Sequence, residues 1–207
     1  MSAENKRTRT GWIVPASVAS VALVASLAAG TLGAYSAQIT NSGNTAGSGG
    51  LTMSESQIVD GQPTNTHNTA EGKNNTISVS DINKYGGNLK MVPGDTTTTT
   101  VQFKNTGSVD ATAFTLNFGD CTVTGQDVGE NSLCDVLQVT VKTGGTTTLT
   151  ENTTPTALAG KSFDIAEPMA VDATKDFDIT VTLPEGTTDT SIMDQQISQN
   201  LVWTLSA

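Results

Sequence analysis

The sequence predicts an all-β protein whose strands form two antiparallel sheets packed as a sandwich. Charged residues make up only 14% of the 207 residues and aromatic residues 4%. Thr, Ser, Asn and Gly are abundant in place of charged and aromatic residues. The β-branched Thr suits the pleated, half-exposed surface of a sheet. Apolar and polar residues alternate with a period of two in several segments, and Gly, Pro and Asn turn signals separate those segments.

Five segments carry the alternation clearly, and each is expected to be a strand. They are residues 97–103, 114–118, 137–141, 177–183 and 201–205. In the clearest of them, Phe177, Ile179 and Val181 point to one face while Asp178 and Thr180 point to the other. Weaker strands are expected at 51–55, 77–79 and 163–165, short helices at 82–85 and 190–197, and exposed polar loops at 56–75 and 145–156.

The N-terminus has the three parts of an export signal. Basic Lys6, Arg7 and Arg9 precede an uncharged stretch from 12 to 32, and the small residues Ala34, Ser36 and Ala37 follow. We expect a signal peptide helix over residues 1–36, cleaved after Ser36 or Ala34 by a signal peptidase. The alternative is a retained membrane helix, since the stretch approaches the roughly 20 residues that a bilayer requires. Both interpretations predict an exported, cell-surface protein whose only membrane contact is this segment.

Two further divisions follow from the composition. Residues 37–50 are small and polar, which predicts a flexible N-terminal segment, and residues 51–207 form the β-sandwich domain. The formal net charge is −10, and no cluster of Lys and Arg follows the signal. Nucleic acid is therefore not an expected partner, because phosphate binding requires clustered positive charge.

The two cysteines, Cys121 and Cys134, flank a turn-rich stretch. In an oxidising compartment the expected outcome is one disulfide, contributing on the order of 3 kcal/mol in the chain-entropy account. A zinc site is the weaker alternative, because such sites need more ligands than two thiols and one distant His.

No catalytic residue, metal site or cofactor is expected. His67 is the only histidine and falls in a polar stretch, and the sequence has neither a Gly-x-Ser-x-Gly elbow nor a His-Glu-x-x-His pair. Acidic residues gather in two places, and solvated charges are favoured over calcium ligands at both. They are Asp172, Asp176 and Asp178 in one group and Asp120, Asp127, Glu130 and Asp135 in the other.

Residues 88–120 read NLKMVPGDTTTTTVQFKNTGSVDATAFTLNFGD. This stretch resembles the TasA/camelysin family of exported bacterial proteins. The shared pattern is Asn88-Leu89, a Pro93-Gly94-Asp95 turn, an alternating strand, and a turn with Asn105, Gly107 and Ser108. Two inserted residues, Met91 and Val92, depart from the family pattern. The export signal (SipW-type in the family), the Gly49-Gly50-Leu51-Thr52-Met53 stretch and the closing LVWTLSA are also similar to that family.

The resemblance implies a jelly-roll-type sandwich, and some members build biofilm matrix fibres by strand donation between subunits. A donor strand centred on Gln38, Ile39 and Thr40 would then occupy the 37–50 segment, whose alternatives are a spacer and a frayed end. A metallopeptidase activity described for the camelysin branch does not carry over, because the zinc-binding pair is missing. The sequence thus predicts a self-associating fibre subunit rather than an enzyme. A monomeric surface binding module is the main alternative, and a secreted metallopeptidase is less favoured.

Overall fold

A computed structural model describes residues 48–69, 80–125, 131–165 and 167–207 of the chain. Several expectations lie outside these residues and stay predictions. They are the signal peptide 1–36, the cleavage residues Ala34, Ser36 and Ala37, the donor candidates Gln38, Ile39 and Thr40, the weak strand 77–79, and Asp127 and Glu130.

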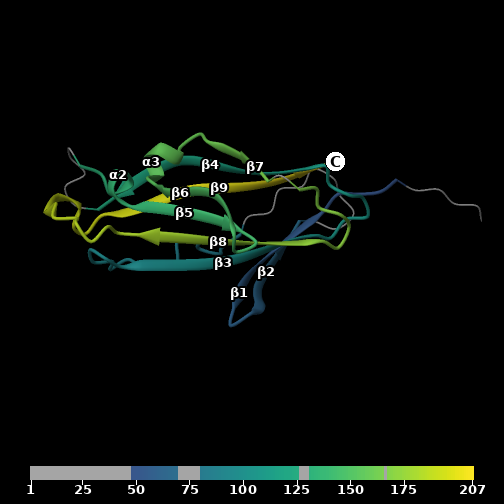
Figure 1. The fold of residues 1–207 in the computed structure, drawn as a ribbon, viewed down its shortest axis with the longest axis horizontal. Helices are drawn as coiled ribbons and strands as arrows, with labels where there is room; N and C mark the ends of the chain where they lie inside the picture. Colours follow the sequence, from purple (N-terminus) through teal and green to yellow (C-terminus); the bar gives the residue numbers. More distant parts are fainter. Residues whose placement is uncertain (1–47, 70–79, 126–130, 166) are drawn as a thin grey trace, which may run out of the picture. The chain divides into compact units, whose positions relative to one another are not determined.

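The described residues form an antiparallel β-sandwich, which confirms the predicted all-β sandwich class (Figure 1). The jelly-roll connectivity implied by the family resemblance stays a prediction. The larger sheet has six strands in the order β2-β1-β3-β8-β5-β6, and the smaller has three in the order β7-β4-β9. The strands are β1 Met53–Val59, β2 Gln62–Asn68, β3 Thr96–Asn105, β4 Ala113–Thr124, β5 Gln138–Thr143, β6 Thr147–Thr153, β7 Ser162–Asp164, β8 Thr174–Thr182 and β9 Gln196–Ser206. Short helical turns are α2 Leu133–Val136, α3 Pro155–Leu158 and η1 Thr190–Ile192.

The core lies between the inner faces of the two sheets. On β8 the predicted inward residues Phe177, Ile179 and Val181 are at most 2% exposed. The ring of Phe177 packs edge-on against Phe103 of β3 and Phe114 of β4, with both centroid distances 5.8 Å. Such pairs contribute beyond the area they bury. The period-two alternation therefore identifies the buried face correctly.

The outer face of the larger sheet is a ladder of hydroxyl contacts. Thr96 meets Thr182 at 3.0 Å and Thr98 meets Thr180 at 2.9 Å across the β3–β8 pair, and the Thr100 hydroxyl donates to Asp178 at 2.6 Å. The five consecutive threonines are thus the start of a strand, as their position before the Val101–Phe103 alternation predicts. Cross-strand pairs of this kind stabilise a sheet by a few tenths of a kcal/mol to about 1 kcal/mol each.

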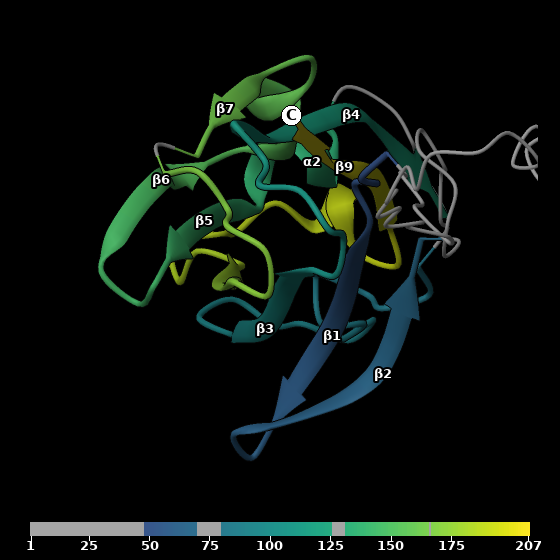
Figure 2. The same cartoon turned by 90° about the vertical axis from the view of Figure 1, so that its right-hand side faces the viewer.

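Two segments expected to be exposed loops are largely strands. Residues 56–75 contain the end of β1, a two-residue turn at Asp60 and Gly61 with φ of 52° and 73°, and all of β2. Asp-Gly is a preferred hairpin turn, and Figure 2 shows the resulting β1–β2 hairpin projecting from the sheets. Residues 145–156 contain β6. Both strands are polar along most of their length, so neither shows the alternation on which strand prediction depends.

The two expected helices are also wrong in large part. Residues 84–87 form turns, because Gly86 and Gly87 adopt φ of 79° and 68° and the Asn83 side chain accepts a hydrogen bond from the Tyr85 amide. Residues 190–197 are divided between the short η1 turn and the first residues of β9. Within the parts of the chain that the structure describes, no helix has the length and apolar character needed to cross a membrane.

Candidate functional site

Strand β9 is one of the four described sheet edges. Among the described strands it pairs with β4 alone, so its other side faces no described strand. Its sequence, QISQNLVWTLS, contains no charged residue, no proline and no glycine over 11 residues. An exposed edge of this length and composition is a template for pairing with another chain.

The remaining sheet edges carry features that discourage pairing. Strand β2 contains Pro63, which has no backbone N–H to donate. Strand β6 carries the charged Glu151, and its register against β5 shifts at two places. Strand β7 is only three residues long. The contrast singles out β9 among the four described edges.

Two hollows run along β9. One of about 870 Å³ lies beside the first half of the strand, and one of about 1160 Å³ lies beside the second half. The two hollows share four lining residues, which are Ser80, Lys84, Asn200 and Leu201. The hollows therefore form one groove along the strand, called here the β9 groove. The larger apolar side chains that line its second half include Leu51, Met53, Phe103, Leu201, Trp203 and Leu205.

Trp203 provides the centre of the second half of the groove. Its indole ring lies 4.5 Å from the Phe103 ring and 4.4 Å from the Phe177 ring, measured between centroids. Its Nε1 atom is buried and has no hydrogen-bond partner among the described residues. An unsatisfied buried donor costs about 1–3 kcal/mol.

A buried ion pair borders the same hollow. Lys84 Nζ lies 2.9 Å from Glu55 Oε1, donates a hydrogen bond to Oε2 at 3.1 Å, and donates another to the Ser80 hydroxyl. Oε1 has the charge contact but no well-aligned hydrogen bond. Side-chain exposures of 12% and 9% leave the pair little solvent screening. The pair connects Glu55 on β1 to Lys84 in the segment that follows residue 79. Removing either side chain would destabilise the fold, because the other charge would stay buried without a partner.

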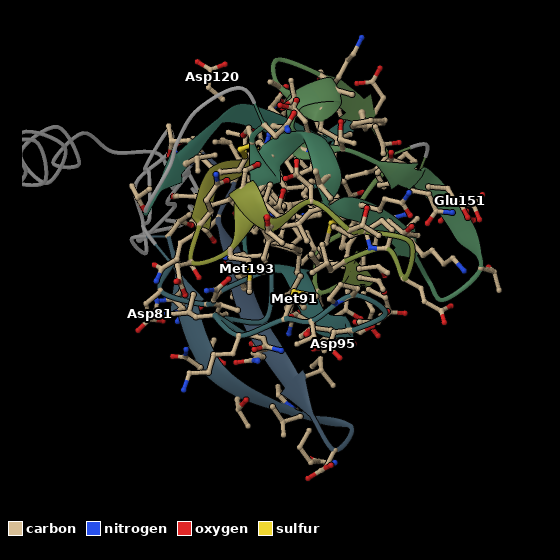
Figure 3. The ribbon with its side chains drawn as sticks, turned by 90° about the vertical axis from the view of Figure 1, so that its left-hand side faces the viewer. Asp81, Met91, Asp95, Asp120, Glu151 and Met193 are labelled. Carbon is tan, nitrogen blue, oxygen red and sulfur yellow. A yellow bond between two sulfur atoms is a disulfide. The ribbon has the colours of Figure 1, made fainter. Side chains whose placement is uncertain are left out.

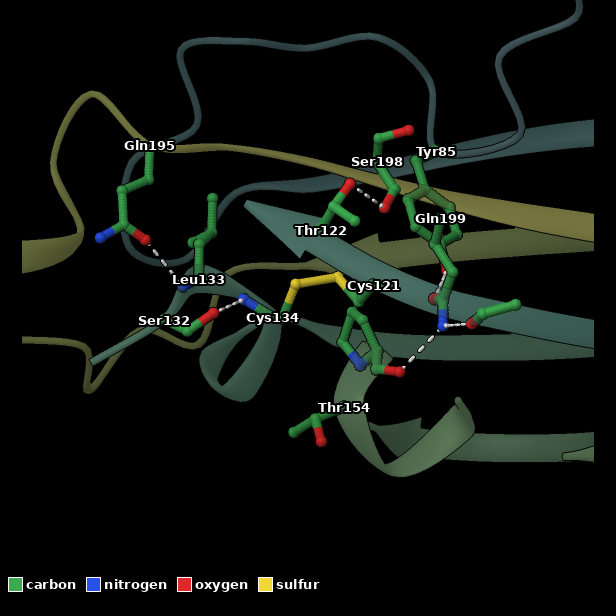
Figure 4. Close-up of a disulfide and its surroundings, with 12 residues drawn as sticks. Tyr85, Cys121, Thr122, Ser132, Leu133, Cys134, Thr154, Gln195, Ser198 and Gln199 are labelled. Atoms are coloured by element: carbon green, nitrogen blue, oxygen red, sulfur yellow. Dashed lines mark hydrogen bonds between the residues drawn. A yellow bond between two sulfur atoms is a disulfide. The ribbon is translucent and has the colours of Figure 1, made fainter. Parts of the chain in front are cut away.

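The Gln199 side chain joins three segments to β9 beside the groove (Figure 4). Its Oε1 accepts from the Tyr85 hydroxyl at 2.5 Å, and its Nε2 donates to the carbonyls of Gly119 at 2.8 Å and Pro155 at 2.9 Å. Burial raises the pKa of Tyr85, so its hydroxyl stays protonated and can donate. The first half of the groove therefore has a fixed wall.

The predicted disulfide between Cys121 and Cys134 is confirmed, with a Cα–Cα distance of 6.2 Å. It joins the end of β4 to α2, where the Ser132 hydroxyl accepts the Cys134 amide as an N-cap (Figure 4). Because both thiols are consumed, the zinc alternative at these two residues is wrong. The cross-link also holds the part of β4 that pairs with the first half of β9.

The last residues of the expected flexible segment are fixed to the sandwich. The Gly50 amide donates to the Ser108 hydroxyl at 2.9 Å, and the Ser108 amide donates to the Gly50 carbonyl at 2.8 Å. Gly107 must be a glycine here, because a Cβ atom would lie 2.4 Å from the Gly50 carbonyl oxygen. Residues 49–50 thus belong to the domain.

His67 lies on β2 rather than in a loop, and its Nε2 is 2.7 Å from Asp81 Oδ1. Asp176 and Asp178 accept from Gln102 and Thr100, and Asp172 pairs with Lys104 at 2.7 Å. Among the residues that the structure describes, Asp120 and Asp135 included, no three or more His, Cys, Asp or Glu side chains gather to hold a metal ion.

The sequence identified β9 as a strand but gave no indication that it lies at an edge beside a groove. The available signal was the absence of charge, Pro and Gly over 11 residues, which differs from β2, β6 and β7. A comparison with known proteins finds no matching family model and no matching curated protein. The resemblance to the TasA/camelysin family therefore stays an expectation drawn from its motifs.

Proposed function

We propose that the protein is a secreted, cell-surface structural subunit that assembles into extracellular matrix fibres by strand donation. Residues 37–50 of one copy would add a strand to β9 of the next copy. The long edge of β9, which pairs with no described strand on its outer side and lies beside a partly apolar groove, is the observation that carries the proposal. The disulfide fits an exported protein, because such bonds persist in oxidising compartments.

Strand addition supplies two kinds of contact. Backbone hydrogen bonds to the β9 edge give affinity that does not depend on side chains, which suits a donor rich in Gly, Ser, Thr and Asn. Alternate donor side chains enter the groove, and Ile39 is the one large apolar residue in the segment. Ile39 would occupy the hollow beside Trp203, with Gln38 and Thr40 facing outward.

The experiment compares the processed chain, residues 37–207, with a shortened chain that begins at residue 48. The deletion stops there because Gly50 is bonded to Ser108. We expect fibres from the first protein in negative-stain electron microscopy and a monomer from the second in sedimentation velocity. Fibres from both proteins, or a persistent monomer from both, would overturn the proposal. The latter result would favour the monomeric binding module.

A matched pair of point variants tests the edge itself. Val202 on β9 is 52% exposed and Val59 at the hairpin tip is 46% exposed, so either can become lysine without entering the core. Val202→Lys is expected to abolish fibres, because an edge lysine opposes strand pairing, while Val59→Lys leaves them unchanged. Equal effects of the two variants would contradict the assignment of the edge.

The rival occupant of the groove is the chain's own 70–79 segment, since Thr69 and Ser80 on either side of it line the same hollow. Loss of fibres with Val202→Lys but not with the deletion would show that a segment other than 37–47 fills the groove. Donation by the N-terminal segment would then be wrong, although assembly through β9 would stand.

A further inference from the structure

An apolar patch lies at one end of the sandwich, beside the start of β9. It consists of Leu89, Val92 and Met193, which are 66%, 59% and 65% exposed and all line the first half of the β9 groove. Figure 3 shows Met193 and the neighbouring Met91 on the end that faces the viewer. Scattered apolar residues on a surface need no explanation, but three large ones at the mouth of one groove indicate an interaction site.

The chain leaves the sandwich at the opposite end of β9. Gly49 lines the second half of the groove together with Ala207 at the C-terminus. The Thr112 amide donates to the Ser206 carbonyl at 2.7 Å, which fixes the C-terminal end of β9 near β4. In Figure 1 the C-terminus and the turn between β8 and β9 lie at opposite ends of the sheets. The N-terminal exit at Ser48 and the apolar patch are therefore at opposite ends of the domain.

The direction of a donated strand decides which end of one copy meets which end of the next. If Ile39 lies opposite Trp203 in an antiparallel pair, residue 46 lies opposite Gln196, and Ser48 of the donor copy emerges beside the patch. In a parallel pair with the same Ile39–Trp203 contact, residue 46 lies beyond Ser206, and the donor copy emerges at the C-terminal end. Only the antiparallel direction covers the patch.

We propose, on the basis of the strand-donation function above, that the donor runs antiparallel to β9 and that the N-terminal end of each copy docks on the apolar patch of the next. The occupant is thus a second copy of this chain, seated head to tail, which is a heterologous contact that extends into a filament. Every strand pair described in both sheets is antiparallel.

The length of the 37–47 segment fits this arrangement. Residues 37–47 extend to roughly 36 Å at about 3.3 Å per residue, and β9 has the same number of residues. The donor copy is therefore drawn against the end of the acceptor with little slack. Its exit end offers Val171, which is 39% exposed and donates its amide to Asp110 at 2.8 Å, next to the Val109 side chain that lies against Gly49.

Disulfide trapping between two cysteine variants determines the direction of the donor strand relative to β9. The only native cysteines are paired with each other, so a cysteine introduced at Ser48 of one variant and at Met193 of another supplies the only free thiols. Mixed fibres of Ser48→Cys and Met193→Cys are expected to cross-link into dimers under mild oxidation. Mixed fibres of Ser48→Cys and Ser206→Cys are expected not to cross-link, and the reverse pattern would overturn the inference.

A charge test addresses the patch independently. The double variant Leu89→Glu/Met193→Glu is expected to keep the circular dichroism and unfolding midpoint of the parent, because both side chains are exposed, and to need about ten times more protein to form fibres. Fibres that form at the parent's concentration would overturn the inference while leaving strand donation intact. Absence of fibres in the parent protein itself would overturn the proposed function instead.

Discussion

Strands β8 and β9 carry nearly the same alternation of apolar and polar residues but lie in different surroundings. β8 has a strand on each side in the six-stranded sheet, and its inward residues Phe177 and Ile179 are completely buried. β9 has one described neighbour, and its inward residues Leu201, Trp203 and Leu205 are only partly buried. A period of two reports which face of a strand is apolar, but not how many strands flank it.

The incomplete burial of β9 is a cost to an isolated subunit. Apolar area left in water forgoes about 25 cal/mol per Å². A strand added along the groove would cover part of the exposed apolar area of Leu201, Trp203 and Leu205. Burial of these partly exposed apolar residues would therefore favour the assembly proposed above.

The largest expected effect separates the two strands directly. Phe177→Ala on β8 should lower the free energy of unfolding by about 3–5 kcal/mol, because it leaves a cavity in a closed core. Leu205→Ala on β9 should cost about 1–2 kcal/mol in the monomer, because the side chain is already partly exposed. Urea unfolding of the chain that begins at residue 48 measures both. Equal costs would show that β9 is covered in the monomer.

The sequence was sufficient for the strands whose two faces differ and for the disulfide. In segments such as 177–183 the alternation of apolar and polar residues predicts which face is buried. Two cysteines separated by a turn-rich stretch allow a single intramolecular disulfide. The sequence was insufficient for β2 and β6, which are polar along most of their length and are held by ladder hydrogen bonds to β1 and β5. Backbone pairing leaves little trace in side-chain composition.

The candidate site was less predictable than the fold. Trp203 and Leu205 belong to the predicted strand 201–205, but the wall opposite them comes from Phe103, Met53 and Lys84. These residues are brought together by the order of strands in the sheets, which depends on long-range pairing rather than on local pattern. The absence of charged residues from the β9 sequence indicates a pairing surface only after the structure has shown that β9 lies at a sheet edge.

The second largest effect concerns the disulfide that supports the β4–β9 pair. Replacing both Cys121 and Cys134 with alanine should cost on the order of 3 kcal/mol, the value for a closed loop of this size. The loss should fall more on β9 than on β8, because the cross-link joins β4, the only described neighbour of β9. Hydrogen exchange measures this for each strand, and a uniform loss of protection would contradict the localised effect.

A smaller effect is expected from the Gln199 side chain. Gln199→Ala removes three hydrogen bonds and leaves the Tyr85 hydroxyl and two carbonyls without that partner. A loss of about 1–3 kcal/mol follows from unsatisfied part-buried groups. The neighbouring Asn200 is exposed on the same strand, so Asn200→Ala is the matched control and should stay within about 0.5 kcal/mol. Similar unfolding midpoints for the two variants would show that the wall of the groove is held by other contacts.

The smallest effect tests the contact between the projecting hairpin and the segment after residue 79. Hydrogen bonds from Asn65, and next from His67, hold the pKa of the Asp81 carboxyl below its ordinary value. A depressed folded-state pKa stabilises the protein above the ordinary carboxyl pKa, and that contribution is lost as the pH falls through the lowered value. Because Asp81 is exposed, the contribution to stability is small, and NMR titration of the carboxyl carbon is the suitable measurement.

Asn65→Ala should raise the pKa of Asp81 toward its ordinary value, and His67→Ala should also raise it, because each variant removes a hydrogen bond to the carboxylate. Asp189 is the internal control, since its pKa is lowered by the Ser191 hydroxyl and amide on the η1 turn and should not change in either variant. An Asp81 pKa that is unchanged in both variants would mean that the hairpin is not bonded to this carboxylate in solution. Among the described residues, the β1–β3 pairing and the Glu55–Lys84 ion pair would then still hold the hairpin to the sandwich.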